Sequence, residues 1–578
     1  MLDLLLQGGT VIDGSGAPGR VGDVGIREGR LVFEGGSARR TVDVTGLVVC
    51  PGFVDLHTHY DAQLSWDASA SPSPLHGVTT AIGGNCGFSL APAGAEHADY
   101  LMRMMARVEG MPLAALEAGL SWDWEGFGDW MGRLDGAIGI NAGFLCGHSA
   151  LRRVAMGDDA VGGVAQPSQV ARMVALLHEA LAAGAMGFST STAPTHNDGA
   201  GDPVPSRSAS TSEMLALASA VGAHPGTTVE LILAGCLNGF TDDEVDLLAG
   251  ISLAAGRPVN WNVLGVSALN PQGHLRQLSA SDRVAAQGGR LVALTLPHTM
   301  QIRLSFLSGF VLDGLPGWRP VLGLAPPERM VALSDPAVRA RLAAGAASDE
   351  AGVLRGLANW ARLELAETFA PANAAFEGRT VGEVAASLGK EPFDALLDVV
   401  VADGLRTGIR PVMRESPEDW KLKTEVWRDP RAIIGGSDAG AHLDMMCGAI
   451  YSSSVLAGVR DKGGLTMEDA VRYLTDVPAR LYGLRERGRL AEGWRADVVV
   501  FDPARVGHGP ERTRADLPGG ASRLYAEGVG FEHVYVNGVE VVAHDRLTGS
   551  TPGTLLRSGL DSETVSVPGA GAVSGAGL

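Results

Sequence analysis

The sequence predicts an α/β fold, a (β/α)8 TIM-like barrel accompanied by a small β-sandwich domain built from both ends of the chain. Two observations predict the barrel: short apolar strand candidates alternate with helical stretches, and eight such strands occur in order. A third predicts the smaller domain, because both chain ends show short strands punctuated by Gly and Asp. A barrel of this kind carries its active site at the carboxyl ends of its strands.

Changes in this pattern along the chain set the expected domain boundaries. Residues 1–48 and 486–546 are expected to form the composite β domain. Residues 49–485 are expected to form the barrel, with a long helical insertion at about 299–431. Residues 547–578 are rich in Gly, Ser and Ala and lack a core pattern, so a loose C-terminal tail is expected there.

Local signals support these elements. The Asn537-Gly538 turn between β-prone runs predicts a hairpin in the composite domain. An amphipathic period predicts a helix over 169–185, and Thr241 with Glu244 forms a capping box for another. In chain order the eight barrel strand candidates are LVVCPGFVDLH, TTAIGGN, GINAGFLCGH, GAMGFSTS, TTVELIL, PVNWNVLG, RLVALTLPH and AIIGGSDAG.

The long insertion before the eighth strand has two interpretations that stay open. It contains helical stretches, one of them behind a capping box of Thr380 and Glu383. An insertion on the catalytic face often covers the site. The alternative is an insertion with a purely structural role.

Composition and charge exclude several classes of function. The chain has 46 Lys and Arg against 65 Asp and Glu, a formal charge of −19 without a basic run. Binding to nucleic acid or to an anionic membrane surface is therefore not expected. Five widely spaced cysteines do not form a disulfide framework, and no apolar run is long enough for a membrane span. A cytoplasmic protein acting on a small molecule is expected, and a homo-oligomer stays open.

Four side chains lie where three of the predicted strands end. His57 and His59 are two positions apart in FVDLHTHYDAQ, so on a strand they point the same way. Cys86 ends the second strand and Asp438 ends the eighth. Imidazole, thiolate and carboxylate together suit zinc best, although another divalent first-row metal would also fit. The sequence therefore predicts a metal site at the mouth of the barrel.

Each of these signals alone has an ordinary explanation. A histidine pair can arise by chance, a buried Cys is usually a small apolar side chain, and a carboxylate after a strand is often a helix cap. Their coincidence on three strand ends favours a site. A metal there lowers the pKa of bound water and polarises a carbonyl. Asp438 can take the proton of that attacking water and pass it to a leaving amine.

The motifs resemble those of a known superfamily. PGFVDLHTHYD, GGNCGFSLAP, GHSALR and GSDAGAH, with the closing GRLAEGWRADVVVFDP, resemble the amidohydrolases and among them the N-acyl-D-amino-acid deacylases, or D-aminoacylases. The resemblance runs from residue 1 to about 546. It implies His57 and His59 as metal ligands, Cys86 as a bridging ligand, and Asp438 as ligand and catalytic base. It also implies hydrolysis of a C–N amide bond that releases a carboxylic acid and a D-amino acid.

The sequence departs from this family at two strands. The family's histidine at the end of strand 5 is absent from TTVELILAG, and Asn262-Val263 stand where strand 6 usually has Ser-His. The family's lysine after strand 6, which receives the substrate carboxylate, is also missing, and strand 4 offers no lysine for a carbamylated bridge. One zinc is therefore expected, and a second stays open.

Other polar residues near the strand ends could complete the site or bind substrate, and each has an ordinary alternative. Those alternatives are a rim salt bridge, a hydrogen bond within a barrel layer, a helix cap, or an exposed charge. The candidates are Glu230 on strand 5, Asn262 on strand 6, His298 after strand 7, His148 in CGHSALR, and Arg410 and Arg414 before strand 8 as anion contacts.

Two further functions stay open beside the amidohydrolase. One is a mononuclear hydrolase of a cyclic amide, lactone or ester. The other is a degenerate, non-catalytic barrel that binds a ligand, although such a barrel would have no need for all four candidate ligands. GHSAL half-resembles a serine nucleophile elbow, but it lacks the second glycine of that motif.

Overall fold

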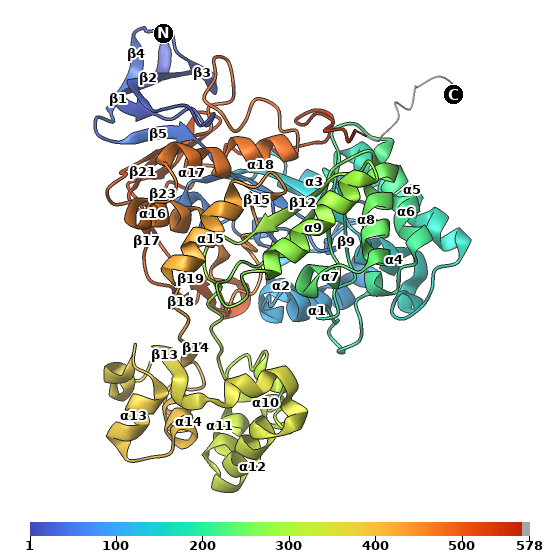
Figure 1. Ribbon diagram of the computed structural model, residues 1–578, viewed down its shortest axis with the longest axis vertical. Coiled ribbons are helices and arrows are strands. Elements are labelled where there is room, and N and C mark those ends of the chain that lie inside the picture. The colour runs from blue at the N-terminus through green and yellow to red at the C-terminus, as the bar shows by residue number, and fades with distance from the viewer. Residues whose placement is uncertain (569–578) are drawn as a thin grey trace.

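The computed structural model describes residues 1–568, and its centre is an eight-stranded parallel sheet (Figure 1). The strands follow one another around the sheet in chain order, as the alternation of strands and helices predicts. All eight strand candidates contribute to it. The strands are β6 (Phe53–Asp55), β7 (Val78–Gly83), β8 (Asn141–Gly147), β9 (Gly187–Ser191), β10 (Thr228–Ile232), β11 (Val259–Leu264), β12 (Leu291–Thr295) and β15 (Ala432–Ile434).

The sheet curls until its first and last strands meet just beyond their carboxyl ends. Thr58 and Ala439 form a parallel bridge. The amide of Asp438 donates to the carbonyl of His57 at 3.1 Å, and the amide of His59 donates to the carbonyl of Ala439 at 2.7 Å. The predicted barrel is therefore confirmed, and the segments that close it are those that carry the histidine pair and Asp438.

Helices surround this barrel, as Figure 1 shows for α5, α6, α8 and α9 on one side. The capping box of Thr241 and Glu244 begins α8 as predicted, since the threonine hydroxyl accepts from the Glu244 amide. The helices are α1 (Ala98–Val108), α2 (Leu113–Gly119), α3 (Phe127–Leu134), α4 (His148–Met156), α5 (Pro167–Ala183), α6 (Thr211–Gly222), α7 (Gly235–Asn238), α8 (Asp242–Ala255), α9 (Gly273–Ala286), α16 (Tyr451–Lys462), α17 (Met467–Leu474) and α18 (Asp476–Leu481).

The first strand candidate is divided between two sheets. Its early part forms β5 (Val48–Pro51), which pairs with β1 (Leu2–Val11) and β16 (Val498–Phe501), and only β6 belongs to the barrel. The break falls at Gly52, where a Cβ atom would lie 2.0 Å from the Thr79 hydroxyl oxygen. The chain can therefore pass from one sheet to the other only where a side chain is missing.

Strands from both chain ends form one mixed nine-stranded sheet, which confirms that the two ends build a common β structure. Its hairpin turns at Asn537-Gly538, where both residues have positive φ angles of 49° and 80°, as this dipeptide predicts. The remaining strands of this sheet are β2 (Arg20–Arg27), β3 (Arg30–Val32), β4 (Ala38–Asp43), β21 (Phe531–Val536), β22 (Val539–Ala543) and β23 (Arg546–Leu547).

The chain between β12 and β15 forms a lobe below the barrel in Figure 1. This lobe has its own apolar core around Trp318, and it contains a two-stranded sheet besides the predicted helices. Helix α15, also within the predicted insertion, packs instead on the barrel, where Trp427 donates to Thr295 at 3.1 Å. The elements are α10 (Arg319–Leu322), α11 (Pro326–Ser334), α12 (Pro336–Ala347), β13 (Leu363–Glu367), α13 (Val381–Leu388), α14 (Pro392–Ala402), β14 (Gly408–Pro411) and α15 (Pro417–Trp427).

The prediction of a loose tail from 547 onward is wrong for the described part of that segment. The amide of Leu556 donates to the carbonyl of Ala142 at 2.7 Å, and that of Gly553 donates to Ile138 at 2.8 Å. Leu555 and Leu556 are buried. Two adjacent leucines therefore fasten this segment beside β8, although Gly and Ser dominate its composition. The last ten residues, 569–578, lie outside the described residues.

Two chain-wide predictions concern cysteines and membranes. All five cysteines are free and buried. Among the helices that the structure describes, none combines the length and the apolarity that crossing a membrane requires. Cys86 differs from an ordinary buried cysteine because its neighbours, His57 and Glu230, are polar.

Candidate metal centre

The candidate ligands lie on short turns that follow the strands. His57 and His59 come directly after β6, Cys86 lies three residues beyond β7, and Asp438 lies four residues beyond β15. Cys86 and Asp438 have positive φ angles of 56° and 60°, which are uncommon for residues with a Cβ atom. Such strained conformations cluster at functional sites, because the surrounding structure must hold them in place.

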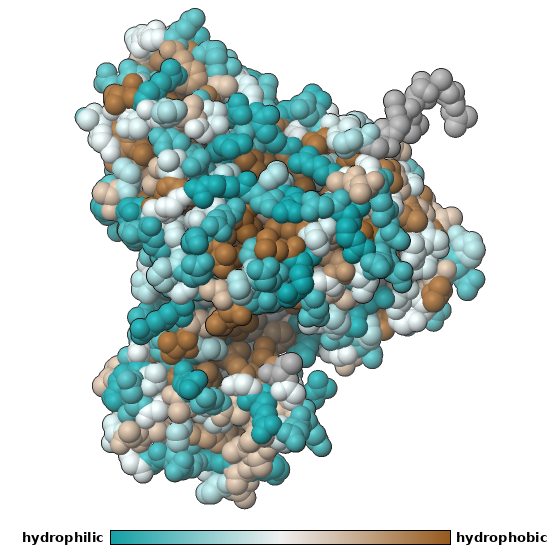
Figure 2. All heavy atoms as spheres, viewed as in Figure 1, coloured by the Kyte–Doolittle hydropathy of each residue, from teal (hydrophilic) through white to brown (hydrophobic). Residues whose placement is uncertain are grey.

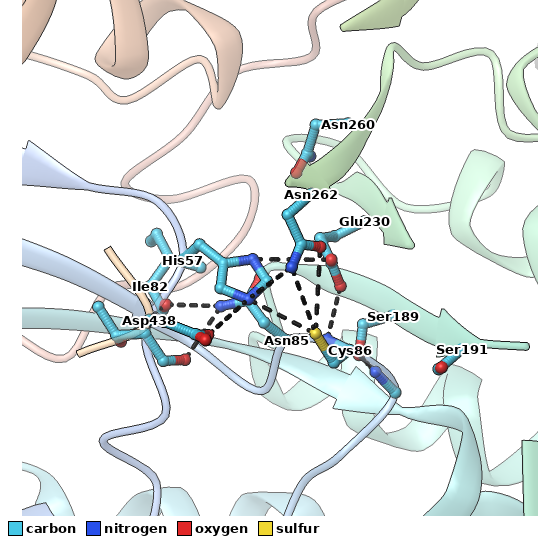
Figure 3. Close-up of polar contacts among 12 residues, drawn as sticks. His57, Ile82, Asn85, Cys86, Ser189, Ser191, Glu230, Asn260, Asn262 and Asp438 are labelled. Atoms are coloured by element: carbon cyan, nitrogen blue, oxygen red, sulfur yellow. Dashed lines mark hydrogen bonds and ion pairs between the residues drawn. The ribbon is translucent and has the colours of Figure 1, made fainter. Parts of the chain in front are cut away.

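The four predicted side chains meet at the carboxyl end of the barrel, and Figure 3 shows three of them, His57, Cys86 and Asp438. Asp438 Oδ1 lies 3.1 Å from His59 Nε2 and 3.4 Å from His57 Nε2. Cys86 Sγ lies 3.5 Å from the same nitrogen of His57. The structure therefore brings His57, His59, Cys86 and Asp438 together, as their strand positions predict.

The fifth and sixth barrel strands, β10 and β11, each add a polar group to this cluster. Glu230 accepts a hydrogen bond of 2.7 Å from the Cys86 amide, and its other oxygen lies 3.7 Å from His57 Nδ1. The Asn262 amide nitrogen lies 3.3 Å from His57 Nε2 and 3.7 Å from Cys86 Sγ. Asn260 points away and donates to the carbonyl of Val229 (Figure 3). Glu230 and Asn262 are therefore the side chains that face His57 from these two strands.

Two residues of the cluster are not among the sequence candidates. Glu109 Oε2 lies 3.5 Å from His59 Nε2, and His442 Nε2 lies 3.5 Å from Asp438 Oδ2. His442 could have been found, because it belongs to the quoted GSDAGAH and lies four residues after Asp438. Glu109 stands in ARVEGMP, outside any motif, and the sequence carries no signal for it.

His148 does not line the mouth and corrects one prediction. Its ring is fully buried, and its nitrogens lie 2.8 Å from the Thr190 hydroxyl and 2.8 Å from Glu213. Arg152 donates twice to the same carboxylate, at 2.6 and 2.7 Å. Both nitrogens of His148 are engaged, so this network stabilises the start of α4.

The remaining candidates lie away from the cluster. His298 and Arg410 line a separate cavity of about 650 Å³ between the lobe and the barrel. Burial lowers the pKa of His298 to about 3, so this ring is neutral. Arg410 pairs with Glu364 at 2.7 Å, and Arg414 is exposed. None of the three has a contact with the candidate ligands among the interactions of residues 1–568.

The cluster holds an excess of buried carboxyl groups. Asp55, Asp61, Glu109 and Glu230 are buried, and the Asp438 side chain is 25% exposed. Within residues 1–568, no Lys or Arg forms an ion pair with any of them. Burial raises the pKa of Glu230 to about 8 and that of Asp55 to about 7, because hydrogen bonds and the charge of His59 only partly offset the lost hydration.

Opposite charges shift the groups at the centre of the cluster. Burial disfavours the charged form of His59, but the carboxylates of Glu109 and Asp438 outweigh it and raise the pKa of His59 to about 9. Burial likewise opposes ionisation of Asp438, yet His57 and His59 hold its pKa well below the usual range. Burial raises the pKa of the Cys86 thiol, and the nearby carboxylates of Glu230, Glu109 and Asp438 raise it further.

These side chains fit a divalent metal ion. One ligand atom from each of His57, His59 and Cys86 lies within 4.8 Å of the other two, and the same holds for His59, Glu109 and Asp438. The buried atoms Nδ1 of His57, Nδ1 of His59 and Oε1 of Glu230 have no hydrogen-bond partner among residues 1–568. Nitrogen, sulfur and oxygen donors in this mixture suit zinc. A divalent cation would also supply the positive charge that the carboxylates lack.

The family is shown by how much of the chain a family model matches. The model of the amidohydrolase family matches residues 40–542. The chain belongs to the amidohydrolase family. This match covers the whole barrel and part of the mixed sheet, so the expectation drawn from the motifs is confirmed at the level of the family.

Three similar proteins show what this amidohydrolase resembles. D-aminoacylase of Alcaligenes xylosoxydans xylosoxydans is 30% identical over 576 residues, which cover 96% of this chain and 97% of that protein. A solved structure of D-aminoacylase, studied for its binuclear metal center, has a TM-score of 0.62 at 27% identity and covers 96% of this chain and 100% of its own. A structure of N-acyl-D-glutamate deacylase from Bordetella bronchiseptica, complexed with zinc and a phosphonate inhibitor, has a TM-score of 0.61 at 25% identity with the same coverage of 96% and 100%.

Proposed function

We propose that this amidohydrolase hydrolyses the C–N amide bond of an N-acyl amino acid or a related amide. His57, His59 and Cys86 would hold the metal, with Asp438 as both ligand and catalytic base. The observation that carries the proposal is the meeting of these four side chains in a buried cluster whose carboxylates pair with no Lys or Arg of residues 1–568. The names of the similar proteins, D-aminoacylase and N-acyl-D-glutamate deacylase, support an N-acyl substrate.

Asp438 is the group best placed to move a proton. Its side chain is 25% exposed, whereas those of His57 and His59 are buried, so it can meet water and substrate. A carboxylate at this position can accept the proton of an attacking water. As the oxygen of that water bonds to the carbonyl carbon and the C–N bond breaks, Asp438 returns the proton to the leaving nitrogen. The chemistry that a metal supplies here is polarisation of the carbonyl and acidification of water.

A cavity beside the cluster supports an apolar acyl group. It has a volume of about 510 Å³ and is lined from the barrel side by Gly110 and from the lobe by Leu307 and Phe310. Gly110 directly follows Glu109, and Asp444, another lining residue, lies two positions after His442. Figure 2 shows hydrophobic residues gathered in the hollow between the lobe and the barrel. This arrangement favours a lobe that takes part in substrate binding.

The substrate is proposed to differ from a simple N-acyl-D-amino acid at its carboxylate end. The resemblance places a carboxylate-binding lysine just after the strand 6 histidine, and Val263 and Leu264 occupy that stretch here. A substrate that lacks a free carboxylate, or that binds it elsewhere, fits this departure. A cyclic amide also lacks one and is therefore the second candidate.

Release of primary amine from a substrate panel tests the proposal. The zinc-loaded protein would be assayed with N-acetyl and N-butyryl derivatives of D- and L-amino acids, with the corresponding amino-acid amides, and with a hydantoin. We expect amine release from linear amides that disappears after chelation and returns with zinc. Ring opening of the hydantoin without any linear amide hydrolysis would favour the cyclic substrate. No turnover of any of these compounds by the zinc-loaded protein would refute the hydrolase.

A further inference from the structure

We propose that Glu109 is a metal ligand and that it forms, with His59 and Asp438, a second cation position beside the one at His57 and Cys86. When both positions are filled, the His59 imidazole serves the second ion, His57 and Cys86 hold the first, and Asp438 lies between the two histidines. This inference rests on the proposed metal of the active site and adds a position that the strand motifs do not contain. Glu109 lies at the end of α1, outside the barrel strands. Glu109 would therefore take the place of the histidines that strands 5 and 6 lack, although it comes from a different part of the chain.

The distances suit ligands that share one ion. Glu109 Oε2 lies 3.5 Å from His59 Nε2, which in turn lies 3.1 Å from Asp438 Oδ1. One ligand atom from each of the three residues lies within 4.8 Å of the others. Two ligands each about 2.1 Å from a tetrahedral ion lie roughly 3.4 Å apart. The three groups can thus surround an ion with little movement.

Glu109 has no other evident role. It is 3% exposed, and its carboxylate accepts no hydrogen bond among those of residues 1–568. Its only ion-pair partner in that part of the chain is His59, which is itself a candidate ligand. A buried carboxylate is costly unless a cation or hydrogen-bond donors replace its hydration. A metal would satisfy Glu109 without requiring His59 to be charged.

The backbone holds Glu109 against the loop that carries Asp438. The Glu109 amide caps α1 by donating to Met105 at 2.9 Å, and its carbonyl accepts from the His442 amide at 2.5 Å. Gly110 follows with a φ of 57°, and a Cβ atom there would lie 3.1 Å from the Cα of His442. This close approach requires glycine. The contact between the end of α1 and the loop is therefore built into the local sequence.

The number of acidic groups in the cluster leaves room for a second ion. Cys86, Glu109, Glu230 and Asp438 all lie within contact distance of His57 or His59. No Lys or Arg of residues 1–568 pairs with them. A single ion at His57 and Cys86 would leave Glu109 without a partner other than His59.

The two positions should prefer different metals. The position at Cys86 contains a soft thiolate and favours zinc or cobalt. The position at Glu109 offers two carboxylates and one imidazole, a harder set that also accepts manganese. We therefore expect the thiolate position to fill first, and the Glu109 position to bind more weakly and to exchange its ion.

Cobalt titration of the metal-free full chain tests the second position without an activity assay. Bound cobalt would be counted by elemental analysis, and the thiolate-to-cobalt absorption band would report the ion at Cys86. We expect two ions per chain for the unchanged protein and one for Glu109→Gln, which should keep the full band. Glu117→Gln, an exposed carboxylate on the neighbouring α2, is the matched control and should keep both ions.

A second variant covers the case in which Glu109→Gln does not fold. Cys86→Ser should lose the band and still bind one ion. Two ions in Glu109→Gln, or a single ion in the unchanged protein, would overturn the second position, as would the absence of bound metal. Two ions that depend on Glu109, in a protein that hydrolyses no amide, would refute the proposed function and leave the second position standing.

Discussion

Exchanging Asp438 for asparagine keeps the volume of the side chain and removes its charge and its proton acceptor. The charge lost lies 3.1 Å from His59 Nε2 and 3.4 Å from His57 Nε2. General acid–base catalysis contributes about 10²–10⁴-fold to a rate. Asp438 is also proposed as a ligand, so we expect the loss in kcat to lie at the upper end of this range. A loss of about 10⁴-fold corresponds to roughly 5 kcal/mol of activation free energy.

The assay measures kcat and KM for amine release by zinc-loaded Asp438→Asn, together with its zinc content and thermal unfolding. KM should change little, because the acyl cavity beside Gly110 is untouched. Asp159→Asn, an exposed carboxylate beyond α4, is the matched control and should keep full activity. A folded Asp438→Asn protein that retains zinc and loses less than threefold in kcat would remove Asp438 from its role as base.

Three further predictions concern stability. Leu556→Ala leaves a cavity at a fully buried position and should lower the free energy of unfolding by about 2–5 kcal/mol in urea titrations; a change below 1 kcal/mol would mean that the segment is loosely attached after all. Glu213→Ala leaves Arg152 buried without its partner and should cost about 3–5 kcal/mol, whereas a neutral result would contradict the network. Burial opposes the charge of Glu540, yet the hydrogen bond with His533 lowers its pKa to about 2. A carboxylate with a lowered pKa stabilises the protein at pH values above its ordinary pKa of 4.5. The stability difference between Glu540→Gln and the unchanged protein should therefore shrink as pH falls from 4.5 toward 2, and a difference independent of pH would refute this.

The barrel strands could be predicted because the information is local. Strands buried on both faces appear as continuous apolar runs bounded by Gly and polar residues, and the candidate ligands stand at the ends of those runs. Since parallel strands place their carboxyl ends at one edge, the meeting of Cys86 with His57 follows from the order of the strands. Glu230 was a candidate for the same reason, but only the register of β10 shows that its side chain faces the cluster.

The features that were missed depend on tertiary contacts. Glu109 reaches the cluster because the end of α1 packs on the loop of His442, and no local pattern encodes that contact. His148 follows a strand end as predicted, but its ring forms a hydrogen bond with Glu213 of α6 and does not contact the cluster. In the C-terminal segment, composition averaged over many residues concealed the two leucines, 555 and 556, that anchor it.

The closure of the barrel has a thermodynamic consequence for the site. The hydrogen bonds between residues 57–59 and 438–439 join the first and eighth strands, and the same residues carry candidate ligands. Separating these strands would pull the ligands apart, so any ion bound there opposes local opening of the barrel in proportion to its affinity. Hydrogen exchange at the amides of His59 and Asp438 should therefore slow when metal is added, while amides of the lobe keep their rates. Catalytic geometry and the integrity of the barrel would then be governed by a single local equilibrium.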